Sequence, residues 1–460
     1  MDNKDTVTAG FQSNYDGDTA AGHLVTSYPS TSRAWWVVFV LLCCYTLSFI
    51  DRQILALMVG PIKQDLNIND FWFAQLTGTA FAVLYSFLGV PIGILADSSN
   101  RKRIIAVGIA IWSLMTAFSG TARSFIALFM YRIGVGMGEA ALSPCAYSMV
   151  ADSFPKEKRA WPMGAYSMGT YVGAGIAMIF GGMIAQYIIG LGPMTWPILG
   201  EMRPWQVIFF VVALPAIPVL LLLLTIREPK RQDLGVGETQ HKVDFRATMR
   251  YMQDRWQLYL LTILGISILA LISYAVFGWY IEFFIRIHHW QRADAGLTFG
   301  LIVLFCGAGG MFSAGAISDR LLAKGHKDAP LRTARYSAMA LIIPLILAPL
   351  MPDARWTVVL LIPGVFALGF HVGLGPSALQ AVTPNKMRGQ VIAIYLLLLN
   401  LLAQIGGQSA PAFLNNYVFH DEMMLGTSLS ITVGVAAVAA ILLLTAAAKR
   451  MRAHQEAHDA

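Results

Sequence analysis

The sequence predicts an all-α membrane protein in which twelve transmembrane helices form two six-helix bundles related by a pseudo-two-fold repeat. Composition is the first reason: 56% of the 460 residues are hydrophobic and 13% are charged, whereas soluble domains contain about 25% charged residues. Segment length is the second reason, because twelve apolar segments are long enough to cross a bilayer. The third reason is an internal repeat that divides the chain into halves of equal length.

Each predicted span contains the roughly 20 mainly apolar residues that a transmembrane helix needs. The spans of the first half are 35–59, 71–96, 103–120, 124–150, 160–188 and 205–226. The spans of the second half are 256–284, 295–320, 332–350, 355–380, 389–414 and 425–448. We therefore expect an N-terminal bundle at 34–226 and a C-terminal bundle at 256–448.

Three polar segments flank these bundles. Residues 1–33 lack a basic start followed by an apolar run, so they predict a disordered cytoplasmic tail, not a signal peptide. Residues 227–255 form a predicted cytoplasmic linker with one short amphipathic helix near DFRATMRYMQDRW. Residues 449–460 form a second cytoplasmic tail.

The two halves share motifs at corresponding positions. GILADSSNRKR (93–103) follows the second span, and GAISDRLLAKG (315–325) follows the eighth. FPKEKRA (154–160) precedes the fifth span, and TPNKMRG (383–389) precedes the eleventh. The offsets of the two pairs are nearly equal, which indicates a duplicated six-helix unit.

The first pair of motifs predicts gating residues between the bundles. Gly93 has no side chain, so another helix can approach closely there. Asp97 lies within reach of Arg101, and Asp319 repeats Asp97 in the second half. The alternative is a membrane stop signal with ordinary surface charges, but the repetition favours a latch that closes the cytoplasmic side.

Basic residues predict the orientation of the chain. With both termini and the loops after even-numbered spans inside, 25 of the 33 Lys and Arg residues are cytoplasmic. The six outside residues are Lys63, Arg123, Arg203, Arg286, Arg292 and Arg355. Cytoplasmic loops of membrane proteins carry such an excess of Lys and Arg. We therefore expect a multi-pass protein with both termini in the cytoplasm, as in a bacterial inner membrane.

Motifs of enzymes and pumps are missing from the sequence. No GxxxxGK[ST], HExxH or GxSxG pattern occurs, and GVGMGE lies inside an apolar span. The four cysteines lack metal-ligand spacing, so we expect small buried side chains. The net charge of +7 is explained by basic residues in the loops, so it does not indicate binding to nucleic acid. We expect no enzyme activity, cofactor, metal or nucleic-acid partner.

Four ionisable residues lie inside predicted spans: Asp51, Arg52, Arg132 and Glu139. Each costs about 2.5–3.5 kcal/mol in hydrocarbon, so such residues usually face a wet cavity and serve function. Arg132 and Glu139 are seven residues apart and share one helix face. Asp51 and Arg52 point roughly 100° apart. Because a carboxyl group in dry surroundings can hold a proton near neutral pH, we assign proton coupling to Asp51 and Glu139.

Structural roles for these residues remain open. Arg132 and Glu139 are a possible self-contained pair that orients their helix, and Asp51 is a possible partner of Arg132 within the bundle. Arg52 is the better candidate for binding an anionic headgroup, and Arg132 is the second. Tyr85, Tyr274 and His371 are candidate substrate-binding residues, since an aromatic-lined cavity suits an amphiphile. Glycines of the fifth span predict close packing between the bundles: Gly164, Gly169, Gly173 and Gly175.

Two motifs resemble signatures of the major facilitator superfamily. GILADSSNRKR is similar to the loop after its second helix, with Ser98 where a basic residue is usual, and RIGVGMGEA (132–140) is similar to its fourth helix. SFIDRQ (48–53) with GEAALSPCAYSMVADSFPKEKRA (138–160) resembles the spinster-type branch. Many relatives have an Asn-Tyr pair before the Asp-Arg. The resemblance implies a major facilitator fold, with a substrate cavity between the bundles that opens alternately to each side.

The spinster resemblance implies a proton-coupled transporter of an amphipathic organic anion or lysolipid, with Asp51, Arg52 and Glu139 as its core. Its partners would be this substrate, protons and membrane lipids, and the chain would act as a monomer. A hexuronate-type organic anion symporter is the close alternative, because that group also places Asp-Arg on its first helix. A lipid sensor that does not transport is the alternative from another class.

Overall fold

The structure is a computed structural model that describes residues 28–197, 200–232 and 245–459. Most of the predicted N-terminal tail and part of the predicted linker lie outside these described residues. Twelve helical spans in the described residues are long and apolar enough to cross a membrane. The prediction of a twelve-helix membrane protein is confirmed, and each observed span overlaps one predicted span.

The N-terminal half contains six spans, four of which consist of two or more shorter helices. Its helices are α1 (Thr31–Gln53), α2 (Val59–Leu66), α3 (Asp70–Thr77), α4 (Thr79–Ser98), α5 (Arg101–Ser119), α6 (Phe125–Glu139), α7 (Leu142–Ser153), α8 (Ala160–Ser167), α9 (Gly169–Leu191), α10 (Pro204–Ala213) and α11 (Ala216–Thr225). A 3₁₀ turn, Ile54–Leu57, extends α1. A short antiparallel hairpin, β1 (Met194–Trp196) and β2 (Gly200–Met202), joins α9 to α10.

The C-terminal half begins with the short amphipathic helix α12 (Phe245–Asp254), which occupies the predicted linker segment. Its remaining helices are α13 (Trp256–Arg286), α14 (Arg292–Ile302), α15 (Ala308–Ala323), α16 (Ala329–Leu347), α17 (Ala354–Leu368), α18 (His371–Val382), α19 (Arg388–Asn400), α20 (Gly406–Phe413) and α21 (Leu425–Asp459). Three π turns lie at Val303–Gly307, Leu401–Ile405 and Leu414–Val418. π turns often mark functional sites in helices.

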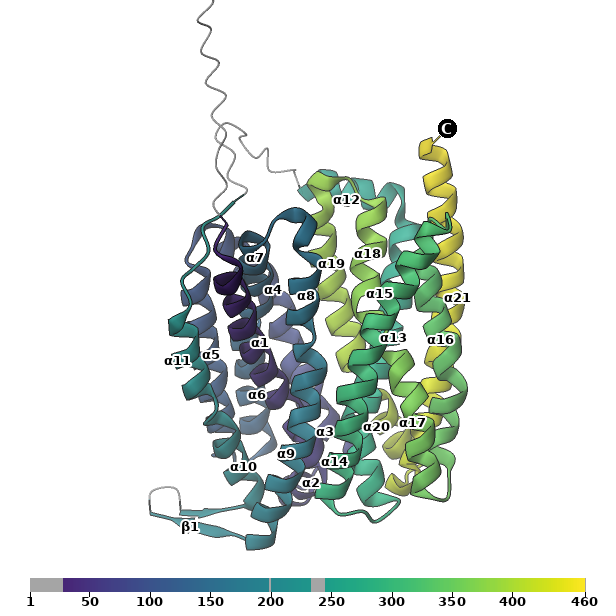
Figure 1. The fold of residues 1–460 in the computed structure, drawn as a ribbon. Coiled ribbons are helices and arrows are strands. Elements are labelled where there is room, and N and C mark those ends of the chain that lie inside the picture. The colour runs from purple at the N-terminus through teal and green to yellow at the C-terminus, as the bar shows by residue number, and fades with distance from the viewer. Residues whose placement is uncertain (1–27, 198–199, 233–244, 460) are drawn as a thin grey trace, which may run out of the picture.

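The two halves stand side by side in Figure 1, with the N-terminal half in purple to teal and the C-terminal half in green to yellow. The start of α1 and the end of α21 lie at the same end of the molecule, which we call the terminal side. The β hairpin lies at the other end, the opposite side. This arrangement is the pair of six-helix bundles predicted from the repeat.

Helices α9 and α14 pack against each other where the halves meet. A Cβ atom added to Gly296 would lie 2.3 Å from the carbonyl oxygen of Met178, and one added to Gly182 would lie 3.3 Å from the Cα of Gly296. A Cβ atom at Gly175 would meet Gly300 of α14 at 3.0 Å. The backbones therefore touch, as small residues permit in membrane helices.

Only part of the predicted glycine packing between bundles is correct. Gly175 contacts the other half, as expected. Gly169 and Gly173 instead pack against Tyr45 and Phe49 of α1 within their own half, and Gly164 has open space around it. The sequence shows which residues are small, but not which of two neighbouring helices each one meets.

Candidate functional site

A cluster of ionisable residues lies in the interior of the N-terminal half, where α1, α4 and α6 meet. The spans place Asp51 and Arg52 on α1 and Arg132 and Glu139 on α6. Asp51, Arg132 and Glu139 are each 1% exposed. The structure thus brings together the four intramembrane charges that the sequence singles out.

Glu139 ends α6 and accepts two hydrogen bonds on one carboxylate oxygen. Arg52 Nε donates to Glu139 Oε2 at 2.7 Å, and the Ser48 hydroxyl donates to the same oxygen. Glu139 Oε1 has no partner among the described residues. A buried carboxylate keeps its charge only when cations and donors compensate it. The two donors on Oε2 provide that compensation here.

Arg52 is also surrounded by aromatic rings. Its guanidinium carbon lies 4.4 Å from the ring centre of Phe81, 4.7 Å from that of Tyr85 and 4.9 Å from that of Phe49. A guanidinium within about 6 Å of a ring is attracted by the electrons of the ring face. Arg52 is therefore held between one carboxylate and three rings, and 8% of its side chain remains exposed.

Asp51 points away from Arg52, as the 100° spacing predicts. Neither of its carboxylate oxygens has a hydrogen-bond partner among the described residues. Its polar neighbours are Glu139, Arg132, Thr116 and Trp112. Two guanidinium nitrogens of Arg132, Nε and Nη1, also lack partners among the described residues. Asp51 and Arg132 are thus buried near each other without a direct ion pair.

The three predicted substrate-binding side chains outside this cluster differ in position. Tyr85 stacks on Phe81, with ring centres 5.1 Å apart, beside Arg52. Tyr274 of α13 lies next to Arg52 from the other half, so the cluster reaches the interface between the halves. His371, the first residue of α18, donates through Nδ1 to the carbonyl oxygen of Leu368 at the end of α17, 2.6 Å away. Among the described contacts, His371 meets none of the four charges.

The predicted gating residues lie on the terminal side and do not join the halves in this structure. Arg101 binds Asp152, and its Nη1 donates to the Ser148 hydroxyl at 2.8 Å, both within the N-terminal half. Asp97 and Asp319 are exposed. A Cβ atom on Gly93 would meet only Pro144, at 3.9 Å, so no helix of the other half approaches Gly93 here.

An ion network that the sequence does not predict joins the halves on the opposite side. Asp70, at the start of α3, is fully buried. Arg286 of α13 binds it with two guanidinium nitrogens, Nη1 at 2.8 Å and Nη2 at 3.0 Å. Lys63 Nζ lies 2.6 Å from Asp70, and Asn415 Nδ2 donates to it at 3.0 Å. One carboxylate therefore connects α2 and α3 with α13 and the end of the eleventh span.

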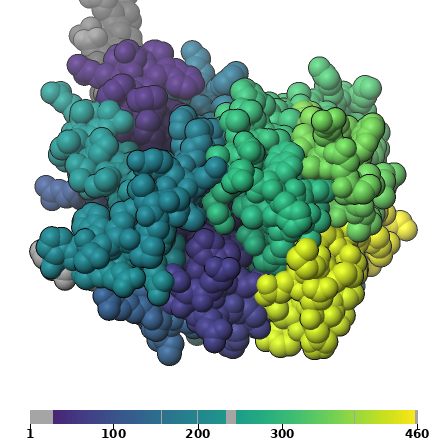
Figure 2. All heavy atoms as spheres, turned by 90° about the horizontal axis from the view of Figure 1, so that it is seen from below, coloured from purple at the N-terminus to yellow at the C-terminus, as the bar shows by residue number. Residues whose placement is uncertain are grey.

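Neighbouring contacts extend this closure. The backbone amide of Phe71 donates to Asn416 Oδ1 at 2.9 Å, and Gln75 Nε2 donates to the Ser409 hydroxyl at 3.1 Å. Figure 2 views the opposite side and shows the purple-blue segment after α1 in contact with the yellow segment before α21. The two halves are thus closed together on this side.

Two kinds of residue in these clusters are not predicted from the sequence, and each leaves a different signal in it. Ser48 lies four residues before Arg52, so helical spacing alone places its hydroxyl on the same face as the guanidinium. Asp70, Lys63 and Arg286 lie at the ends of spans, where charges usually belong to solvated loops. Only the fold shows that Lys63 and Arg286 meet at the buried Asp70. Among the described residues, no group of three or more His, Cys, Asp and Glu side chains could hold a metal.

Comparisons with known proteins agree on one family. The family model of the Major Facilitator Superfamily matches residues 41–408. An MFS-type efflux pump of Mycolicibacterium smegmatis is 25% identical over 421 residues, which cover 91% of this chain and 90% of that protein. Protein spinster homolog 1 of Xenopus tropicalis is 27% identical over 328 residues, covering 67% of this chain and 59% of that protein.

Solved structures agree with this result. The structure of a bacterial homolog of the human lysosomal transporter Spinster, in an inward-facing and unoccupied conformation, matches with a TM-score of 0.73 and 25% identity. The match covers 93% of this chain and 98% of that one. A D-xylose–proton symporter matches with a TM-score of 0.64 at 14% identity, which shows a shared fold.

Proposed function

The chain belongs to the major facilitator superfamily and is a spinster-like transporter, and on this premise we propose a proton-coupled carrier of an amphipathic organic anion or lysolipid. One observation supports the coupling above all others. Glu139 is a buried carboxylate whose charge is compensated by Arg52 and the Ser48 hydroxyl. Protonation of Glu139 removes the charge that holds Arg52 in place.

Release of Arg52 links the proton to the substrate. Once Glu139 is neutral, the Arg52 guanidinium is available for an anionic headgroup, which it can bind with two parallel hydrogen bonds. The rings of Phe49, Phe81 and Tyr85 around Arg52 suit the apolar part of an amphiphile. Asp51 is the second proton-coupling acid in this proposal, because its unpartnered carboxylate faces Arg132.

Alternating access follows from the arrangement of the two halves. Rocking of the halves would break the network around Asp70 on the opposite side and bring Gly93, Asp97 and Asp319 together on the terminal side. Protonation drives this change only if it favours one of the two states. The terminal side faces the cytoplasm of a bacterial inner membrane in this proposal, because basic residues concentrate there.

A substitution of Glu139 tests the proposal. Purified protein in vesicles is given a pH gradient, and uptake of fluorescent lysophosphatidylglycerol is followed with Glu139→Gln and with the control Glu201→Gln, which changes an exposed hairpin residue. We expect Glu139→Gln to lose gradient-driven uptake while keeping its folded elution profile, and Glu201→Gln to behave as wild type. Unchanged gradient dependence in Glu139→Gln would overturn the proposal.

A small organic anion is the second candidate substrate. The probable galactarate/D-glucarate transporter of Bacillus subtilis is 24% identical over 458 residues and covers 93% of this chain and 95% of that protein. Arg52 would bind the carboxylate of such a substrate equally well. Gradient-driven uptake of D-glucarate, with no competition by lysophosphatidylglycerol, would favour this candidate over the first.

A further inference from the structure

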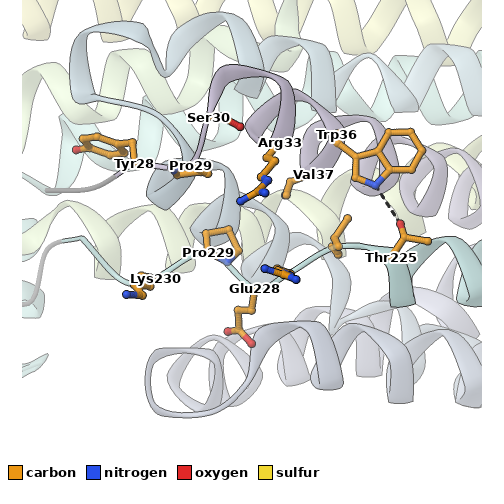
Figure 3. A pocket seen from close by; sticks show the side chains of 12 residues that line it. Tyr28, Pro29, Ser30, Arg33, Trp36, Val37, Thr225, Glu228, Pro229 and Lys230 are labelled. Atoms are coloured by element: carbon orange, nitrogen blue, oxygen red, sulfur yellow. Dashed lines mark hydrogen bonds between the residues drawn. The ribbon is translucent and has the colours of Figure 1, made fainter.

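A cavity unrelated to the central charges opens on the terminal side of the N-terminal half. It has a volume of about 490 Å³ and lies between the start of α1 and the segment that follows α11. Figure 3 shows Tyr28, Ser30 and Arg33 on one wall and Glu228, Pro229 and Lys230 on the other. None of its lining residues belongs to the cluster around Glu139.

The cavity carries an excess of positive charge. Arg33, Arg227 and Lys230 line it, and all three are exposed. Among the described residues, these three make no ion pair or side-chain hydrogen bond. The acid in the wall, Glu228, is already engaged, because its Oε1 accepts from the backbone amide of Arg101 at 3.0 Å and from its Nε at 3.1 Å. Glu228 Oε2 has no partner among the described residues, and Glu228 shares Arg101 with Asp152, so three basic residues stand against one acid in the cavity wall.

Exposed tryptophans beside the cavity indicate a position near the lipid headgroups. Trp35 and Trp36 of α1 are 40% and 42% exposed, and Trp side chains gather where a bilayer meets water. The Trp36 indole nitrogen donates to the Thr225 hydroxyl at 3.0 Å, which joins α1 to the end of α11 beside the cavity (Figure 3). An acyl chain entering beside Trp36 would therefore have its headgroup in the cavity.

The helix start adds hydrogen-bond donors. Ser30 is the N-cap of the 23-residue α1, and its side chain makes no capping hydrogen bond. The first amides of a helix lack partners inside the helix and favour anions. Ser30 and Arg33 of this helix start line the cavity. Arginine side chains bind phosphate oxygens in pairs, so the donors present match a phosphate group.

We propose that this cavity binds the phosphate of an anionic phospholipid headgroup from the leaflet on the terminal side. The lipid is a bound partner and not the cargo, because the site lies outside the path between the halves. The bound headgroup would connect the start of α1 with Arg227 and Lys230, where the chain leaves the first bundle. A free phosphate would use the same donors but not the membrane-facing surface of Trp36.

Lipid retention by the full-length protein tests this proposal. Delipidated protein is titrated with dioleoylphosphatidylglycerol, dioleoylphosphatidylcholine or inorganic phosphate, and bound species are counted by native mass spectrometry. The test variant combines Arg33→Gln, Arg227→Gln and Lys230→Gln. The matched control combines Lys324→Gln, Lys386→Gln and Arg450→Gln, which remove the same charge from exposed positions of the other half.

We expect the test variant to bind phosphatidylglycerol roughly 100-fold more weakly, since each basic residue near an anionic headgroup strengthens binding about fivefold. The control should bind as wild type, and wild type should prefer phosphatidylglycerol to phosphatidylcholine. If the triple variant does not fold, Arg33→Gln and Lys230→Gln alone should each weaken binding about fivefold.

Two results would overturn the lipid proposal: equal binding by wild type and the charge variants, or displacement of phosphatidylglycerol by an equal concentration of inorganic phosphate. The second result would assign the site to a soluble phosphate. Glu139→Gln should retain phosphatidylglycerol as wild type does. Failure of the transport proposal and failure of this one are therefore distinguishable.

Discussion

The two ends of the molecule use similar charges for different purposes. On the opposite side, Asp70 receives Arg286 from the other half, so the ion pairs hold the halves together. On the terminal side, Arg101 receives Asp152 and Glu228 from its own half, so these ion pairs only fasten helix ends within one bundle. Closure therefore depends on which elements an ion pair connects, and not on how many ion pairs an end contains.

Burial decides how strongly each network acts. Breaking a buried ion pair by removing one partner costs about 3–5 kcal/mol, because the other charge is left uncompensated. An exposed pair contributes about 0–1 kcal/mol. Asp70 is fully buried, whereas 40% of the Glu422 side chain in the same network is exposed. Substitutions at the two ends should therefore have effects of different kind and size.

The largest effect is expected from Asp70→Asn. This change removes the buried carboxylate that Arg286 and Lys63 share and leaves them Glu282 and the partly exposed Glu422 as counter-charges, which costs the closed state about 3–5 kcal/mol. The opposite side should open in most molecules. Spin labels at Gly190 and Pro352, on a background free of the four native cysteines, should report a longer distance by double electron–electron resonance. Arg286→Gln should lengthen it too, and the double variant should show less than the sum.

An intermediate effect of another kind is expected from Asp152→Asn on the terminal side. Arg101 is 1% exposed and would lose its strongest partner, at a cost of about 1–3 kcal/mol. Because the pair lies within one half, thermal stability in detergent should fall while the distance between Gly190 and Pro352 stays the same. A change in that distance with Asp152→Asn would contradict the comparison between the two ends.

The smallest effect is expected from Glu422→Gln. Its pair with Lys63 is partly exposed, so the closed state should lose less than about 1 kcal/mol. The shift in the label distances should be slight and should disappear at high salt, because salt screens exposed charges. A shift as large as that of Asp70→Asn would show that Lys63, and not Arg286, is the main partner in closing this side.

The sequence predicted the spans well because apolar length is a local property. The sequence also singled out four intramembrane charges, Asp51, Arg52, Arg132 and Glu139, because a charge inside an apolar span is costly and can be recognised without knowing its partners. Helix faces then followed from spacing, as with Asp51 and Arg52. The amphipathic helix α12 was likewise predicted from the residues of its own segment alone.

Contacts between distant segments could not be predicted in the same way. Asp70 and Arg286 are 216 positions apart, and each alone looks like a solvated charge at a span end. The same limitation applies to the glycines of the fifth span, since a small residue suits either neighbour. His371 is a polar residue in an apolar span, and substrate binding by it stays a prediction. The structure shows only that its Nδ1 donates to Leu368 at the end of α17.

The backbone contact between α9 and α14 has a mechanical consequence. Because Gly182 and Gly296 leave no space between the two helices, the bundles cannot move closer along this seam and can only roll about it. Rocking of the halves, as proposed above, would turn about this contact, and the ends of the long spans would move furthest. An alanine at Gly296 would push α9 and α14 apart at this contact. It would therefore reduce the movement of the span ends at both membrane surfaces.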